Sequence, residues 1–156
     1  MELLWTRLDG RNGHEAGRTL LAQLVPDMGP IQVTAQGKPY FADGKCHFSI
    51  SHCQNHAFCA TSHRNIGIDA EEIGRPVHPN LAQKILSPRE MARYAASSDK
   101  NEAILRFWVL KEAHAKLTGR GWGNYLRQTD FDPNDERIQI IDGCYVAVIE
   151  EEDHAF

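Results

Sequence analysis

The sequence predicts an α+β fold with antiparallel strands, and three observations support this prediction. Residues 46–52 alternate with period two, and the strand-like residues 56–62 follow after a short polar break. Residues 99–118 form the longest stretch with helical periodicity. Two later apolar runs are separated by Asp-Gly at 142–143, a dipeptide typical of a two-residue hairpin turn.

Local signals place the remaining elements. The expected order is helix 14–25, strand 31–34, strands 46–52, 56–62 and 65–69, helix 80–86, a helix from Ser87, helix 99–118, and strands 137–141 and 144–149. The first helix stops before Pro26. Residues 87–90 read Ser-Pro-Arg-Glu, a capping box with proline at the first helical position. The longest helix can end at a left-handed Gly119 or Gly121.

Composition limits the function classes. A chain of 156 residues with 42% apolar and 24% charged residues suits one soluble domain or two small packed halves. No apolar run is long enough for a membrane helix, and the first residues lack a signal-peptide core, so we expect a cytoplasmic protein without a membrane partner. A net charge of −4 argues against nucleic acid as the main partner.

The stretch NIGIDAEEIG at 65–74 contains the first candidate site residues. Asp69 and Glu71 lie two residues apart at the end of an expected strand, so both carboxylates should point to the same face. Like charges side by side repel each other, and a bound cation would offset that repulsion. Simple exposure at the strand end, with no ligand, is the alternative.

The long helix contains the second set of candidates. At about 100° per residue, Glu112 and Lys116 continue an arc that starts with the core-type residues Leu105, Trp108 and Val109. A solvated pair four residues apart is the alternative interpretation. Buried charges need partners, so the three carboxylates could instead converge on one Mg²⁺ ion, which prefers oxygen ligands and commonly also binds a phosphate.

These motifs resemble the paired signature of the 4′-phosphopantetheinyl transferase superfamily, in its Sfp-type form with a short N-terminal half. The usual pattern is (I/V)G(I/V)D-x-E followed by W-x-x-K-E-(A/S)-x-x-K, and here IGIDAEE is followed by FWVLKEAHAK, with 43 positions from Asp69 to Glu112. Further upstream, GKPYF at 37–41, FSISHC at 48–53 and GRTLLAQLV at 17–25 resemble other family segments. The likeness covers about residues 15–127.

The resemblance implies an activity. Members transfer the 4′-phosphopantetheine arm of coenzyme A to a serine of an acyl or peptidyl carrier protein, require Mg²⁺ and release 3′,5′-ADP. The implied metal ligands are Asp69, Glu71 and Glu112, and the implied catalytic residues are Asp69, Glu112 and Lys116. Glu112 would also take the serine proton, directly or through a water. The implied coenzyme-binding residues are Arg18, Lys38, Pro39, Ser51, His52, Lys111 and Lys116.

The resemblance also implies an architecture. The family fold has two similar halves, each a small antiparallel sheet packed on a long helix, with the site between them. We expect the halves to be residues 1–63 and 64–156. All the motifs lie in one chain, which favours a monomer over a trimer. Sfp-type enzymes carry a longer segment before the first helix, so we expect an effect on coenzyme affinity more than on chemistry.

Three alternatives compete with this interpretation. A zinc protein is one, because Cys46, His47, His52, Cys53, His56, Cys59 and His63 cluster within a short stretch; their spacing is irregular and lacks a Cys-x₂-Cys pair, so we expect reduced, partly buried cysteines instead. A cysteine nucleophile is the second, but His52 and Cys53 point to opposite faces of a strand. The third is a non-catalytic module of this fold that binds carrier protein or coenzyme A. The presence of all three carboxylates and Lys116 favours an enzyme.

Overall fold

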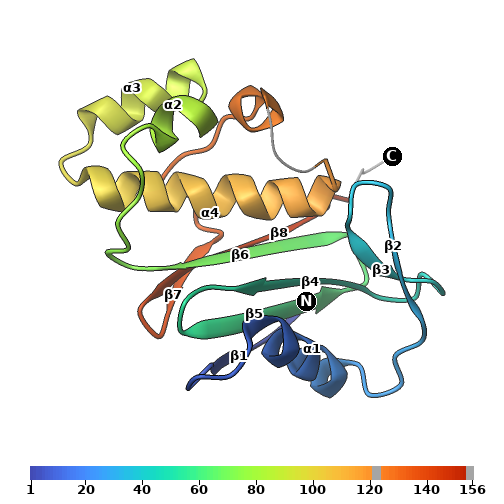
Figure 1. Cartoon of the computed structure of the whole chain (residues 1–156). Helices are drawn as coiled ribbons and strands as arrows, with labels where there is room; N and C mark the ends of the chain where they lie inside the picture. Colours follow the sequence, from blue (N-terminus) through green and yellow to red (C-terminus); the bar gives the residue numbers. More distant parts are fainter. Residues whose placement is uncertain (121–123, 154–156) are drawn as a thin grey trace.

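The structure is a computed structural model that describes residues 1–120 and 124–153 (Figure 1). Its elements, in chain order, are β1 (Glu2–Arg7), α1 (Gly13–Leu24), β2 (Ile31–Val33), β3 (Pro39–Phe41), β4 (His47–His52), β5 (His56–Ser62), β6 (Ile66–Glu72), α2 (Leu81–Ile85), α3 (Pro88–Ala96), α4 (Lys100–Thr118), the 3₁₀ helix η1 (Asn124–Gln128), β7 (Ile138–Ile141) and β8 (Cys144–Glu150). None of the helices in these described ranges is both long and apolar enough to cross a lipid bilayer.

Two three-stranded antiparallel sheets form the centre of the molecule. Their strand orders are β1-β5-β4 and β6-β8-β7, and β2 and β3 form a separate two-stranded ribbon. In Figure 1, α1 lies against the first sheet and α4 covers the second, on opposite sides of the molecule. The expected α+β architecture, with a small antiparallel sheet and a helix in each half, is therefore confirmed.

Strand β5 is buried along its whole length because it contributes to two cores. Ala57 and Cys59 pack with α1 residues, whereas Phe58 and Ala60 on the opposite face pack with β6 and β8. Alternating strand residues point to opposite faces, so a strand between two apolar layers must be small or apolar throughout. The strand thus joins the two halves through shared side-chain packing.

The side chains of β6 also alternate between two neighbouring layers, and this alternation positions the candidate carboxylates. Ile66, Ile68 and Ala70 enter the core shared with β5, so Gly67, Asp69 and Glu71 face α4. A Cβ atom at Gly67 would lie 1.9 Å from the carbonyl oxygen of Ala113 in α4. Glycine at this position lets the helix approach the strand closely enough to place its own side chains beside Asp69.

Most of the expected elements are confirmed. Asp99 caps the long helix through its side chain, and Gly119 ends it with a φ of +70°, while the alternative Gly121 lies outside the described residues. The capping box at Ser87 is present. Asp142 and Gly143 both have positive φ in the final hairpin. Strand β1, the short strand β3 and η1 were not expected from the sequence. The division at residue 63 falls between β5 and β6 and stays a prediction.

Candidate active site

A pocket of about 450 Å³ lies where the two halves meet. Its wall combines side chains from α1 and β4 of the first half with side chains from β6 and α4 of the second. Eight of the ten candidate residues line it: Arg18, Lys38, Pro39, Ser51, His52, Asp69, Glu112 and Lys116. The structure therefore brings together segments that are far apart in the sequence.

The floor of the pocket is a junction between β4 and β6, the adjacent edge strands of the two sheets. In the described chain no backbone hydrogen bond joins these two strands, and serine hydroxyls bridge them instead. Ser49 Oγ accepts from the Ile68 amide at 3.1 Å, and Ser51 Oγ accepts from the Ala70 amide at 3.2 Å. Buried amides need such partners, so the two serines set the spacing of the junction.

Asp69 and Lys116 form an ion pair in this junction. Lys116 Nζ lies 3.1 Å from Asp69 Oδ1 and also donates to the carbonyl oxygens of Ile68 at 2.9 Å and Ile50 at 3.3 Å. Ser51 Oγ donates to the same Oδ1 at 3.1 Å. The Lys116 ammonium therefore links β4 and β6 through hydrogen bonds and fixes the orientation of the Asp69 carboxylate. Burial raises the pKa of Asp69, and Lys116 opposes that shift.

Two buried carboxylate oxygens in the pocket lack a hydrogen-bond partner among the described residues: Asp69 Oδ2 and Glu112 Oε1. Burial, with a further contribution from Asp69, raises the pKa of Glu112 to about 7. Unpartnered buried oxygens carry a free-energy cost that a cation would remove. The donor set, hard carboxylate oxygens on adjacent elements, fits a hard divalent cation such as Mg²⁺.

Glu71 stands beside this pair without lining the pocket. Its Oε1 accepts from the Trp108 indole at 3.1 Å, and its Oε2 lies 2.6 Å from Arg75 Nη1. Burial raises the pKa of Glu71, and the negative charge of Asp69 raises it further. The expectation that both strand carboxylates face α4 agrees with this arrangement. A role for Glu71 as a metal ligand stays a prediction, which would require its contact with Arg75 to loosen.

Lys111 is the candidate that the structure places elsewhere. Its Nζ is fully buried between α3 and α4, 2.5 Å from Glu90 Oε1 and 2.8 Å from the Thr129 carbonyl oxygen. Burial lowers the pKa of this ammonium, and Glu90 opposes that shift. The expected contact with phosphate is therefore wrong for this structure. The flank that Lys111 shares with Ile104 and Phe107 packs on the short helices rather than on the pocket.

The coenzyme-binding candidates of the first half give the pocket a cationic side. In the part of the chain that the structure describes, no hydrogen bond or ion pair engages the Arg18 guanidinium. His52 lies exposed at the rim. The Lys38 ammonium, in contrast, donates to Asn65 Oδ1 at 2.6 Å and to the Leu117 carbonyl oxygen at 2.7 Å. Lys38 therefore contributes its stem to the wall while its charge stabilises the end of α4.

Sequence reasoning missed several residues of the wall, including His14, Gln36, Phe48 and Ser49. For two of them, His14 and Ser49, the spacing in the sequence could have revealed their position. His14 precedes Arg18 by four positions and so lies on the same face of α1. Ser49 precedes Ser51 by two positions in a strand, which places both hydroxyls on one face.

Comparisons with known proteins agree with this geometry. The sequence model of the 4′-phosphopantetheinyl transferase superfamily matches residues 65–152. The 4′-phosphopantetheinyl transferase HetI of Nostoc sp. is 34% identical over 127 residues, which cover 71% of this chain and 53% of that protein. The 4′-phosphopantetheinyl transferase gsp of Aneurinibacillus migulanus is 29% identical over 124 residues, 70% of this chain and 52% of its own. The chain spans about half the length of these curated relatives.

Proposed function

The chain belongs to the 4′-phosphopantetheinyl transferase superfamily, and from this premise we propose that it transfers the 4′-phosphopantetheine arm of coenzyme A to a serine of an acyl or peptidyl carrier protein. The by-product of the proposed reaction is 3′,5′-ADP. The observation that best supports the proposal is the pair of unpartnered oxygens, Asp69 Oδ2 and Glu112 Oε1, in a pocket that also contains Arg18.

The charge distribution of the pocket suits a diphosphate nucleotide. The carboxylates lie on the β6–α4 side and the unengaged guanidinium of Arg18 lies on the α1 side. Arginine binds phosphate through a planar fork of N–H donors, so we assign Arg18 and His52 to the 3′-phosphate region. Ser51 shares this assignment, although its hydroxyl already bonds Asp69. The Lys38 stem and Pro39 would border the adenine.

We assign Mg²⁺ to Asp69 and Glu112, with Glu71 as the third ligand. The unpartnered oxygens of the first two residues fit this assignment. When bound, Mg²⁺ would neutralise the diphosphate and stabilise charge on the leaving group. Lys116 would hold Asp69 in the orientation that ligation requires, because its ammonium is already bonded to that carboxylate.

Glu112 is our candidate for the proton acceptor. A general base works best when its pKa lies near the working pH, and burial brings the pKa of Glu112 to about 7. Its carboxylate would take the proton of the incoming serine hydroxyl, directly or through a water. The hydroxyl oxygen would then attack the phosphorus that carries the pantetheine arm, and the bond to the nucleotide phosphate would break.

The proposed setting is the cytoplasm, with one chain forming a complete site. All four cysteines are free thiols, as expected in a reducing compartment. Residues from both halves of a single chain line the pocket, which supports a monomer over an assembly that shares its sites between subunits.

The test is to incubate the chain with coenzyme A, Mg²⁺ and a panel of apo acyl and peptidyl carrier proteins, and to measure the mass of each carrier. We expect the mass gain of one phosphopantetheine arm on at least one carrier, and no gain with an Asp69→Asn variant. Binding of coenzyme A without transfer to any carrier would identify a non-catalytic module and contradict the proposal.

A further inference from the structure

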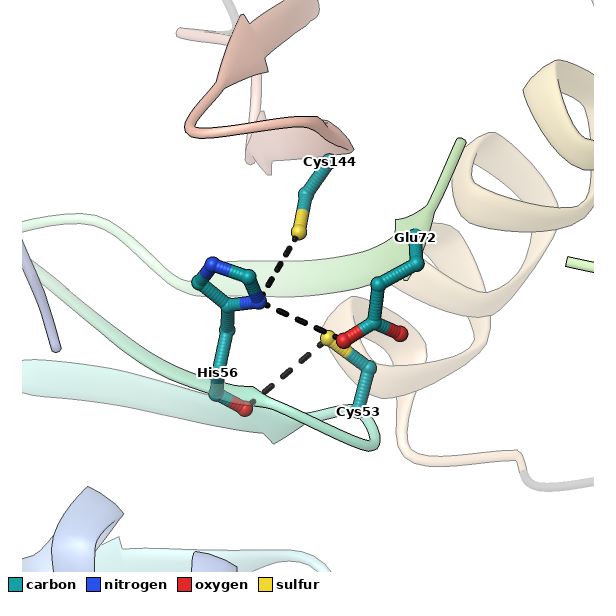
Figure 2. A group of neighbouring side chains, drawn as sticks. All are labelled: Cys53, His56, Glu72 and Cys144. Carbon is teal, nitrogen blue, oxygen red and sulfur yellow. Dashed lines mark hydrogen bonds and ion pairs between the residues drawn. The ribbon is translucent and has the colours of Figure 1, made fainter. Parts of the chain in front are cut away.

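A second group of metal-ligating side chains lies outside the pocket. Cys53, His56, Glu72 and Cys144 each offer one donor atom, and these atoms all lie within 4.8 Å of one another. Figure 2 shows the two sulfurs, the imidazole and the carboxylate facing one another. The group combines the turn between β4 and β5 with the ends of β6 and β8, so it joins the two halves of the fold.

Two of the distances between the donor atoms are close to those of tetrahedral zinc, and the others lie within 4.8 Å. With Zn–S near 2.3 Å and Zn–N and Zn–O near 2.1 Å, tetrahedral angles separate sulfur from nitrogen by about 3.6 Å and nitrogen from oxygen by about 3.4 Å. Cys144 Sγ lies 3.4 Å from His56 Nδ1, and His56 Nδ1 lies 3.3 Å from Glu72 Oε1. Both contacts are hydrogen bonds in the metal-free chain, and a metal ion could replace them with little movement of the side chains.

The surrounding contacts orient the ligands as a metal site requires. His56 Nε2 donates to Asp142 Oδ2 at 2.8 Å, so in the neutral imidazole the lone pair lies on Nδ1, where a metal would bind. Arg7 holds Asp142 through two hydrogen bonds, at 2.7 and 2.8 Å. Metal-binding histidines commonly donate their other N–H to a carboxylate in this way. The backbone amides of Gln54 and Asn55 donate hydrogen bonds to the Glu72 carboxylate at 3.3 and 2.8 Å.

Burial separates this group from ordinary surface acids. His56 and Cys144 are buried, whereas Cys53 and Glu72 are half-buried and leave a path from solvent. Two thiols, one imidazole and one carboxylate are the ligands of a borderline-soft cation and not of Mg²⁺. The site therefore differs in chemistry from the carboxylate pair in the pocket.

We propose that Cys53, His56, Glu72 and Cys144 bind one structural Zn²⁺ ion that clamps the two halves together. Binding releases the thiol protons of both cysteines to solvent, and four protein ligands close the coordination shell. The expectation of no zinc site rested on spacing between residues 46 and 63. That stretch contains only two of the four ligands, so local spacing could not reveal the site.

The site also has a geometric relation to the pocket. His52 lines the pocket and is followed directly by Cys53, the first residue after β4, whereas Glu71 and Glu72 are consecutive in β6 and point to opposite faces. Glu71 lies beside the pocket carboxylates, so one member of each pair lies at or near the pocket and the other belongs to the proposed zinc ligands. The inference itself stands on the four ligands alone and does not depend on the proposed transfer activity.

The experiment uses the full chain, reduced and stripped of metal, and titrates it with Co²⁺ and with Zn²⁺. We expect one equivalent of Co²⁺ to produce thiolate-to-cobalt absorption in the near ultraviolet and strong visible bands of tetrahedral cobalt. Zn²⁺ should abolish both signals and raise the melting temperature by about 5 °C or more. Carboxylate-bound cobalt at Asp69 and Glu112 gives no thiolate absorption, so the two sites are distinguishable.

Variants test the ligand set. Cys53→Ser and Glu72→Gln should lower zinc affinity at least about 100-fold, whereas Asp142→Asn should lower it about 10- to 100-fold and keep the thiolate absorption at saturation. Cys46→Ser is the matched control, since Cys46 is also a half-buried cysteine but lies outside the group. Its variant should bind zinc like the unchanged chain.

Three results would overturn the proposal. One is absence of thiolate absorption in the unchanged chain at saturating Co²⁺, a result that requires no variant to fold. Another is thiolate absorption per bound Co²⁺ that is as intense in Cys53→Ser as in the unchanged chain, because the loss of one of two thiolates should about halve it. The last is a Cys53–Cys144 disulfide that forms in air although one equivalent of Zn²⁺ is present, found by peptide mapping.

Discussion

Lys116 Nζ lies 3.1 Å from Asp69 Oδ1, and the other oxygen of that carboxylate, Oδ2, is buried without a partner among the described residues. The helix lysine therefore satisfies one oxygen of the strand aspartate and leaves the second directed at the pocket. The unpartnered Oε1 of Glu112 belongs to the same wall. This division of roles within one carboxylate underlies the predictions for the site.

Asp69→Asn and Glu112→Gln should each lower transfer at least about 100-fold, because either change removes one charged ligand of the proposed Mg²⁺ and metal ions contribute several kcal/mol to such reactions. Glu112→Gln keeps the shape of the side chain and breaks no ion pair, so its free energy of unfolding should not fall. Asp69→Asn leaves Lys116 without its counter-charge, so its transfer is compared per folded fraction, measured by circular dichroism. Glu102→Gln, a more exposed change on the same helix, is the control and should transfer normally. Near-normal transfer by Asp69→Asn would contradict the metal assignment.

Lys116→Met should lower transfer about 10-fold or more, because Asp69 loses both its counter-charge and its orientation. The junction also loses the bonds from Lys116 to the carbonyl oxygens of Ile50 and Ile68. Steady-state kinetics with varied Mg²⁺ should show a raised requirement for the metal. An unchanged Mg²⁺ requirement would show that Lys116 does not act through Asp69.

Lys111→Met should destabilise the fold by about 3–5 kcal/mol, because it leaves the buried Glu90 carboxylate without its counter-charge. Urea unfolding followed by circular dichroism measures this loss. The folded fraction should transfer at the normal rate, since Lys111 does not line the pocket. Restored stability in a Lys111→Met, Glu90→Gln double variant would confirm that the lost pair is the cause.

The metal-free protein should lose stability as pH rises from about 4.5 to about 7. Glu112 has an ordinary pKa of 4.5 and a pKa of about 7 in the folded chain, so the folded state binds more protons in this window. The contribution, about 3 kcal/mol for a pKa raised from 4.5 to about 7, is complete below pH 4.5 and lost above pH 7. Glu112→Gln should flatten this part of the profile in chelator-containing buffer. An identical pH profile for the variant would show that Glu112 does not titrate there.

Gly67→Ala should destabilise the fold by about 1–3 kcal/mol or more, because the added Cβ would overlap the carbonyl oxygen of Ala113. The helix must move away from β6 to accommodate it, so transfer by the folded fraction should fall as well. Gly29→Ala is the control, since a Cβ there meets only an ordinary contact 3.6 Å from Asp43 Oδ2. Equal stability of the two variants would contradict the close approach.

The local signals of the sequence predicted the helices and most strands because those signals are short-range. The Ser87 capping box, the Gly119 helix end and the Asp-Gly turn each depend on a few adjacent residues. Strand β1 went unnoticed because its apolar residues are only half-buried at the edge of a sheet, where β5 supplies its partner. That partner lies some fifty residues away in the chain.

The candidate site also contains contacts between residues that are far apart in the chain, which local patterns cannot predict. Period two placed Asp69 and Glu71 on one face of the strand, and period 3.6 placed Glu112 and Lys116 on one arc of the helix. In the structure Asp69, Glu112 and Lys116 line one pocket. Helical spacing could not reveal that Glu90 encloses Lys111, because that pairing depends on how α3 docks on α4. The two cysteines of the proposed zinc site are harder to predict, since Cys144 lies in the second sheet and Cys53 beside the first, and only the packing of the sheets brings them together.

The junction of β4 and β6 gives the molecule a direction of mechanical weakness. Within each sheet, opening would break a whole ladder of main-chain bonds, whereas between these strands it would break only the few bonds of Ser49, Ser51 and Lys116. No main-chain ladder therefore resists bending along the line that runs under the pocket, and side-chain contacts and the shared core resist it instead. The nucleotide of the proposed reaction would leave over this line, with the main-chain ladders of both sheets intact.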